Sequence, residues 1–255
     1  MGHEFEADKR AELDATPEQV WEAIATGPGI DSWFMGRNQV EPGEGGKVTT
    51  NFAGYNPTAS VTAWDPPHRF AYRTPEAEDG RFIAYEFLIE GRGGGSTVLR
   101  LVTSGFLPGD DWESEYDAMT KGDQLFFSTL VTYLGHFAGR TGTPVTAFGP
   151  PVDDWPRAWA ALHRELGLDG PPREGDRVRS AGDPPVEGVV YFTNADTVGV
   201  RGEQAIYRFL RGLGGPMVAA HVLFGEADQA AAERAWRAWL VRVFGQGSGP
   251  TAAGP

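Results

Sequence analysis

The chain contains no cysteine, which excludes disulfide bonds, thiolate metal ligands and cysteine nucleophiles. It also lacks the run of roughly 18 to 20 apolar residues that a membrane-spanning helix needs. Its first residues, MGHEFEADKR, contain no apolar signal core. We therefore expect no insertion into a membrane and a cytoplasmic location.

Positive charge is scarce as well. Lys and Arg number 22 against 35 Asp and Glu, which gives a net charge of −13. Such a chain repels a polyphosphate backbone on average, so nucleic acid is excluded as a partner. The five histidines show no paired spacing of metal ligands. We expect neither a metal nor a cofactor, and the patterns leave any protein partner open.

One order of patterns occurs twice along the chain. A strand-like run, a Trp-bearing helix, alternating strands and a long closing helix extend from about residue 5 to 137, and in shortened form from about 145 to 244. This order predicts a complete domain over 1–140, a shortened second copy over 141–245 and a disordered tail over 246–255. A single domain with a C-terminal extension is the alternative.

The first copy contains clear signals for its elements. Thr16 followed by Pro17 and Glu18 predicts the start of a helix. Segments rich in β-branched and aromatic residues follow, separated by Pro-Pro, EDG and GRGGG turns, and their period-two alternation predicts strands with one strongly aromatic face. From about Trp112 to Phe137 apolar residues recur at helical spacing, which predicts a long amphipathic helix.

Five of these segments occur in an order that resembles a known family. They are TPEQVWEAI, SWF at 32–34, HRFAYRT, STVLRLVTSGF and a tryptophan, Trp112, at the start of the long helix. The first half is similar to bacterial domains related to the C-terminal domain of the activator of the 90-kDa heat-shock protein ATPase. That family belongs to the START-related, birch-pollen-allergen-like (SRPBCC) superfamily.

The resemblance implies an α+β helix-grip fold, in which a curved antiparallel sheet wraps around a long C-terminal helix. It also implies a cavity between the sheet and that helix. The second half matches the superfamily only in outline, and we interpret it as a degenerate copy. Members of the family share no single activity, so the resemblance does not assign a function.

These patterns favour the binding of a small hydrophobic molecule in the first domain, as a carrier, sensor or sequestering protein. The residues expected at the site are Trp33, Phe34, Phe70, Tyr72, Tyr85, Phe87, Leu101, Thr103, Tyr116, Asp123, Phe126 and Leu130. Aromatic residues at these spacings either line a cavity or fill the core themselves, and both interpretations stay open. In the second copy, Trp236 and Trp239 are large enough to fill the equivalent space.

Two other classes of function stay open. A polyketide cyclase or aromatase would need ionisable groups aimed into the cavity, for which Tyr85 and Asp123 are the candidates. A non-catalytic interaction module would have no cavity and would dock a partner on an exposed face. Because no His, Arg or carboxylate is clearly predicted on the inner face of the sheet, binding is favoured over catalysis and catalytic residues stay unknown.

Overall fold

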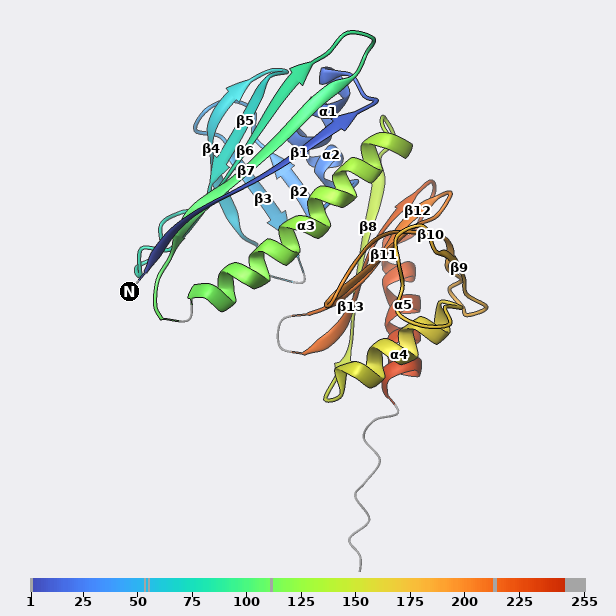
Figure 1. Cartoon of the computed structure of the whole chain (residues 1–255). Helices are drawn as coiled ribbons and strands as arrows, with labels where there is room; N and C mark the ends of the chain where they lie inside the picture. The colour runs from blue at the N-terminus through green and yellow to red at the C-terminus, as the bar shows by residue number, and fades with distance from the viewer. Residues whose placement is uncertain (1, 53, 55, 111, 213–214, 246–255) are drawn as a thin grey trace, which may run out of the picture. The chain divides into compact units, whose positions relative to one another are not determined.

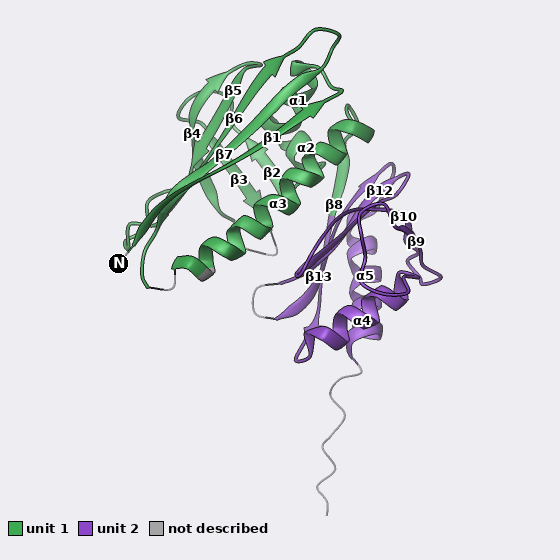
Figure 2. Ribbon diagram, in the orientation of Figure 1, with its two compact units in different colours: residues 1–144 green, residues 145–255 purple. Residues whose placement is uncertain are grey.

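The computed structural model describes residues 2–52, 54, 56–110, 112–212 and 215–245. The predicted disordered tail, 246–255, lies outside these described residues. The chain divides into two compact units, residues 1–144 and 145–255 (Figure 2). Within the described residues, no helix combines the length and the hydropathy needed to cross a bilayer.

The first unit is a seven-stranded antiparallel sheet with a long closing helix. Its elements, in chain order, are β1 (His3–Leu13), α1 (Pro17–Ala25), α2 (Gly27–Asp31), β2 (Arg37–Val40), β3 (Lys47–Asn51), β4 (Thr58–Asp65), β5 (Arg69–Arg73), β6 (Phe82–Gly91), β7 (Thr97–Leu107) and α3 (Trp112–His136). The strand order is β1-β7-β6-β5-β4-β3-β2, and α3 packs along β1 and β7 (Figure 1). This is the helix-grip arrangement.

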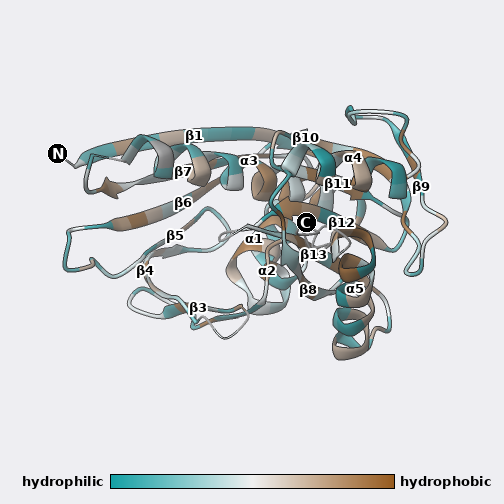
Figure 3. Cartoon of the chain, turned by 90° about the horizontal axis from the view of Figure 1, so that it is seen from below, coloured by the Kyte–Doolittle hydropathy of each residue, from teal (hydrophilic) through white to brown (hydrophobic). Residues whose placement is uncertain are grey.

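The register of the strands places side chains in rows across the inner face of the sheet. Lys9, Leu101 and Phe87 lie opposite one another on β1, β7 and β6. The adjacent row contains Thr103 and Tyr85, which continues to Tyr72 on β5. Parts of β6 and β7 are hydrophobic (brown in Figure 3). Because residues two apart share a face, the two rows together form one wall beneath α3.

Helix α1 begins with a reciprocal capping box. The Thr16 hydroxyl accepts a hydrogen bond from the Gln19 amide at 3.3 Å, and the Gln19 side chain accepts one from the Thr16 amide at 2.9 Å. Pro17 occupies the first turn, where its missing N–H costs nothing. Val20, Ala23 and Ile24 then face the core.

Replacing Thr16 with alanine should lower the free energy of unfolding of the first unit by about 1 kcal/mol, because one N-cap acceptor is lost. Chemical denaturation of the full chain measures this loss. The Glu12→Ala variant, at a nearby exposed strand position, should stay within about 0.5 kcal/mol of the parent. An equal loss in both variants would contradict a specific role of the cap.

The second unit repeats the first in shortened form. It contains β8 (Gly142–Pro151) from Val145 onward, α4 (Trp155–Glu165), β9 (Arg177–Arg179), β10 (Glu187–Asn194), β11 (Thr197–Arg201), β12 (Ala205–Arg211), β13 (Pro216–Phe224) and α5 (Gln229–Phe244). Its six-stranded sheet has the order β8-β13-β12-β11-β10-β9. As in the first unit, the first strand pairs with the last one, and a helix, α5, closes the chain.

Trp236 and Trp239 occupy the core of the second unit. Their side chains are 2% and 0% exposed, and both belong to the main hydrophobic cluster of that unit. Phe209 lies 5.8 Å from Trp236 and 5.4 Å from Trp239, between ring centroids. The two indoles therefore fill space between the second sheet and its closing helix, as their size predicts.

Candidate functional site

A pocket of about 200 Å³ lies between the first sheet and the helices α2 and α3. Its 18 lining residues come from α2, α3, the strands β2 to β7 and the segments between them. Thirteen of them are hydrophobic if Tyr72 and Tyr85 are included, and Asp123 is the one charged residue among the described lining residues. The pocket therefore has mainly apolar walls and few polar groups, which is typical of small-molecule sites.

Nine of the twelve predicted site residues line this pocket. They are Trp33, Phe34, Tyr72, Tyr85, Phe87, Leu101, Asp123, Phe126 and Leu130. That these residues bind a ligand stays a prediction.

The aromatic wall on the helix side is held in place by specific contacts. Trp33 donates a hydrogen bond from Nε1 to the carbonyl oxygen of Ala23 at 2.9 Å, which fixes its indole after α2. Phe34 lies 5.5 Å from the Trp33 ring and 4.5 Å from the Phe126 ring, between centroids. These ring contacts pack the segment after α2 against the middle of α3.

Phe70 and Thr103 lie outside the lining. Phe70 is fully buried, and the rings of Trp21 and Trp64 lie 6.1 Å and 5.6 Å from its own. The indole of Trp21, on α1, packs against Phe70, so Phe70 is part of the hydrophobic core. Thr103 is also fully buried, and it lies opposite Tyr85, which itself reaches the pocket. The prediction placed both residues on the correct strands but did not separate lining residues from those behind them.

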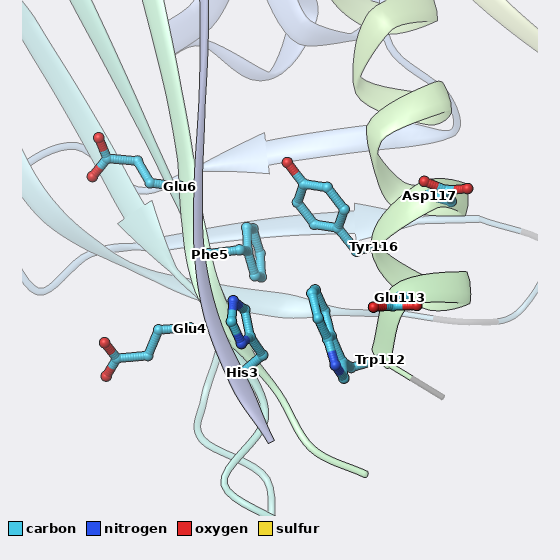
Figure 4. A pocket seen from close by; sticks show the side chains of 8 residues that line it. All are labelled: His3, Glu4, Phe5, Glu6, Trp112, Glu113, Tyr116 and Asp117. Carbon is cyan, nitrogen blue, oxygen red and sulfur yellow. The ribbon is translucent and has the colours of Figure 1, made fainter. Parts of the chain in front are cut away.

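Tyr116 lies in a different hollow, at the beginning of α3. This second hollow, of about 670 Å³, is formed by the first residues of β1 and the first turns of α3. Figure 4 shows His3 and Phe5 pointing toward Trp112 and Tyr116, while Glu4 and Glu6 point away from them. The His3 and Trp112 rings stack at 4.1 Å.

The second hollow suits an apolar ligand less well than the central pocket. Four of its eight lining residues are acidic, namely Glu4, Glu6, Glu113 and Asp117. Removing carboxylates from water costs free energy unless they are paired. The central pocket has a single charged lining residue, so it is the better candidate for a hydrophobic guest despite its smaller volume.

One end of the central pocket is polar and charged. Asp123 of α3 lies there, and its Oδ2 is 3.7 Å from Nζ of Lys9 on β1. Both side chains are mostly buried, with 14% and 12% of the Lys9 and Asp123 side chains exposed. The rings of Tyr72 and Tyr85 stand side by side at 5.2 Å. The pocket therefore combines apolar walls with two phenols and one carboxylate, whose charge is balanced by Lys9 from outside the lining.

Burial changes the protonation chemistry at this end. It raises the pKa of Asp123, although the charge of Lys9 and the hydroxyl of Thr103 act against that rise. Burial also raises the pKa of Tyr72 and of Tyr85, and the nearby Asp123 carboxylate raises both further. Both phenols therefore stay protonated at neutral pH and can donate hydrogen bonds.

Sequence reasoning did not identify Lys9 as part of the site. Lys9 alternates with Phe5 and Ala7 along β1, but an isolated lysine at a half-buried strand position usually reaches out to solvent. Asp123 supplies the partner charge from α3. Only the pairing of β1 with β7 and the packing of α3 on β1 bring the two residues together.

The walls supplied by β2, β3 and β4 were also missed. Asn38, Val48, Thr50 and Ala59 line the pocket. Asn38 is held by Asp31, whose Oδ1 accepts hydrogen bonds from the Asn38 backbone and side-chain amides at 2.7 Å and 3.0 Å. β2 and β3 are short and largely polar, so alternation alone did not distinguish their inner face.

Comparison with known proteins agrees with this architecture. The fold of the first unit is that of a START-like helix-grip domain. Residues 14–135 match the family described as "Activator of Hsp90 ATPase homolog 1-like protein". No curated protein is detectably similar in sequence to the chain.

Several solved structures are similar to the chain. A protein from Mesorhizobium loti is 24% identical, covering 51% of this chain and 96% of its own, with a TM-score of 0.45. The Aha1 dimer from Colwellia psychrerythraea is 21% identical, with the same coverage and a TM-score of 0.40. The di-domain ARO/CYC BexL from the BE-7585A biosynthetic pathway is 12% identical, covering 96% of this chain and 90% of its own, with a TM-score of 0.47. At these TM-scores, the similarities carry no inference about function.

Proposed function

We propose that the first unit binds a small, mainly apolar molecule in the pocket between its sheet and α3. The observation that carries this proposal is the pocket itself, about 200 Å³ in volume with 13 hydrophobic residues among its 18 lining residues. Water in such a space makes few hydrogen bonds to the walls. Its release on binding contributes about 25 cal/mol per Å² of apolar area removed from water.

The volume limits the size of the ligand. The pocket of about 200 Å³ corresponds to the liquid volume of roughly seven water molecules. It is smaller than the roughly 300 to 1,000 Å³ that is usual for drug-sized ligands. We therefore expect a molecule of one or two rings, or an aliphatic chain of similar volume, to be enclosed without rearrangement.

Native mass spectrometry of the full chain, purified without organic solvent, tests the proposal directly. A small molecule retained at a one-to-one ratio, or saturable binding of naphthalene in a calorimetric titration, would support it. Absence of both a retained molecule and any binding of single-ring and two-ring hydrocarbons would overturn it.

Filling part of the pocket should weaken this binding. Ala59 lies on the inner face of β4 and lines the pocket, so the Ala59→Leu variant places three additional carbons inside it. We expect the affinity for naphthalene to fall about tenfold, which is the effect of about 1.4 kcal/mol. The Ser60→Leu variant adds a similar side chain on the exposed face of the same strand and should bind as the parent does. Equal affinities in all three proteins would contradict the assignment of the pocket.

A second candidate, a cyclase-like enzyme, is favoured by one specific observation. Tyr85 and Asp123 both line the pocket, so a proton donor and a carboxylate are available to a bound carbonyl compound. Turnover of a model polyketide that is lost in the Tyr85→Phe variant would favour the enzyme. Binding without turnover would favour the carrier, sensor or sequestering role.

The surface gives less support to an interaction module. Such a module would expose a contiguous apolar face, but of the large hydrophobic side chains in the described residues only Val241 is exposed, at 53%. Val241 belongs to the second unit, so the first unit has no such side chain to offer within its described part. Ligand binding therefore remains the function that the geometry supports best.

A further inference from the structure

The polar end of the pocket contains buried oxygen atoms that lack hydrogen-bond partners. Asp123 Oδ2, on a lining residue, and Thr103 Oγ1, behind the lining, are both buried, and neither makes a hydrogen bond of ordinary length and angle within the described residues, although the Thr103 hydroxyl lies near enough to Asp123 to favour its charged form. The ammonium of Lys9 balances the charge of Asp123 but, at 3.7 Å, is farther away than a hydrogen bond allows. Since buried polar groups are nearly always hydrogen-bonded, these two atoms indicate a partner that comes from outside the chain.

We infer that the ligand is an uncharged cyclic molecule with a hydroxyl group, and that this hydroxyl donates a hydrogen bond to Asp123. The inference rests on the proposed function, because it concerns the same pocket. It names the chemical class of the ligand and makes Asp123 a specificity-determining residue, with Lys9 keeping its charge balanced.

The charges around this end favour a neutral ligand over a charged one. A carboxylate accepts hydrogen bonds and cannot donate them, so an anionic ligand meets an acceptor of its own sign at Asp123. A cationic ligand meets the ammonium of Lys9, which already neutralises Asp123. A neutral hydroxyl supplies the missing donor and adds no charge to a site that is mostly buried.

The neighbouring tyrosines also favour a neutral ligand with a hydroxyl group. Tyr72 and Tyr85 line the pocket and lie close enough to Asp123 for its charge to act on both. A phenol can both donate and accept a hydrogen bond. The two rings, 5.2 Å apart between centroids and tilted by 35° to each other, also offer aromatic faces against which a cyclic ligand can pack. A hydroxyl attached to a flat ring system fits these walls and reaches Asp123.

A matched series of naphthalene derivatives tests the inference on the full chain. We expect 2-naphthol to bind about tenfold more tightly than naphthalene and 2-methoxynaphthalene, because only the naphthol donates a hydrogen bond to a charged acceptor. Naphthoate and naphthylmethylammonium should bind no more tightly than naphthalene. If the hydrocarbon binds and the naphthol binds equally, the inference fails while the proposed function stands. If none of the five compounds binds, the proposed function fails and the inference falls with it.

Replacing the Lys9–Asp123 ion pair with apolar side chains tests whether these two residues cause the preference for 2-naphthol. The double variant Lys9→Met/Asp123→Leu removes both charges together, so neither is left buried alone, and such exchanges are often neutral for stability. It should bind naphthalene at least as tightly as the parent and show no preference for 2-naphthol. Persistence of the tenfold preference in this variant would overturn the inference.

The matched control is the ion pair on the opposite face of the same two strands. Asp8 and Arg100, 2.8 Å apart and about half exposed, neighbour Lys9 and Leu101 in sequence. The Asp8→Leu/Arg100→Met variant should retain the tenfold preference for 2-naphthol. If this control loses the preference as well, the effect does not arise at Asp123 and the inference is wrong.

Discussion

Replacing Trp239 with alanine should lower the free energy of unfolding of the second unit by about 3 to 5 kcal/mol. Trp239 is fully buried and lies at the centre of an aromatic cluster with Trp236, Phe209 and Phe244. Truncation removes the transfer free energy of the indole and leaves a cavity that the surrounding rings cannot fully close. Because a domain of this size is stabilised by only about 5 to 15 kcal/mol, the loss should be visible at room temperature.

Amide hydrogen exchange of the full chain measures this loss in each unit separately. Peptides from α5 and β12 should lose protection in the variant, whereas peptides from α3 should not. The control is Val241→Ala on the same helix, whose side chain is 53% exposed and whose loss should change stability by no more than about 0.5 kcal/mol. Similar exchange in the two variants would show that Trp239 is not a central packing residue.

Much of the fold could be predicted because its signals are local. Thr16 with Pro17 marks the start of α1, and the predicted capping residue makes the observed hydrogen bonds. The α+β class, the antiparallel sheets and the long helix after the last strand of the first copy are confirmed. These features depend on capping, turn residues and periodicity, all of which act within a few residues of the chain.

The boundaries of the site could be predicted only in part. Alternation identifies which residues of a strand share a face, but it does not say how far a neighbouring helix covers that face. Phe70 shares its face with Tyr72, yet Trp21 from α1 packs against Phe70 and keeps it out of the lining. Tyr116 follows the helical spacing of Phe126, yet it lies nearly three turns away, in a separate hollow.

The two units show how similar topologies use aromatic residues differently. In the first unit, Phe34, Phe126 and Tyr85 stand around a space of about 200 Å³. In the second, Trp236 and Trp239 extend from the closing helix into the core and pack against Phe209. The difference is one of side-chain volume on the closing helix, where α5 presents indoles and α3 presents Phe126, Phe127 and Leu130.

Acidification should destabilise the second unit through one buried histidine. His221 on β13 is almost fully buried, and its Nδ1 accepts a hydrogen bond from the backbone amide of Arg208 at 3.0 Å. Its Nε2 has no partner in the described structure. Burial, and then the charge of Arg208, hold the pKa of His221 well below its usual value. Protonation would add a donor at Nδ1 where the Arg208 amide already donates, so the neutral ring fits this core and the charged ring does not.

The sign of the pH effect follows from this lowered pKa. In the unfolded chain the imidazole takes up a proton near pH 6.5, whereas in the folded unit it stays neutral. The unfolded state therefore binds more protons, and the contribution of neutral His221 to stability is fully present above pH 6.5. It is lost as the pH falls toward the folded-state pKa, by about 1.4 kcal/mol for each pH unit below 6.5.

Hydrogen exchange of β12 and β13 peptides, compared between pH 7.5 and 5.5 after correction for the intrinsic exchange rate, measures this loss. The His221→Asn variant keeps an acceptor for the Arg208 amide but does not titrate in this range, so its stability should be lower overall and nearly independent of pH. The His163→Asn variant on α4, where the imidazole is only half-buried, should retain the dependence. A steep loss of stability on acidification in the His221→Asn protein would show that another group is responsible. A flat profile in that variant alone would identify the neutral imidazole beside Arg208 as the acid-sensitive group in the core of the second unit.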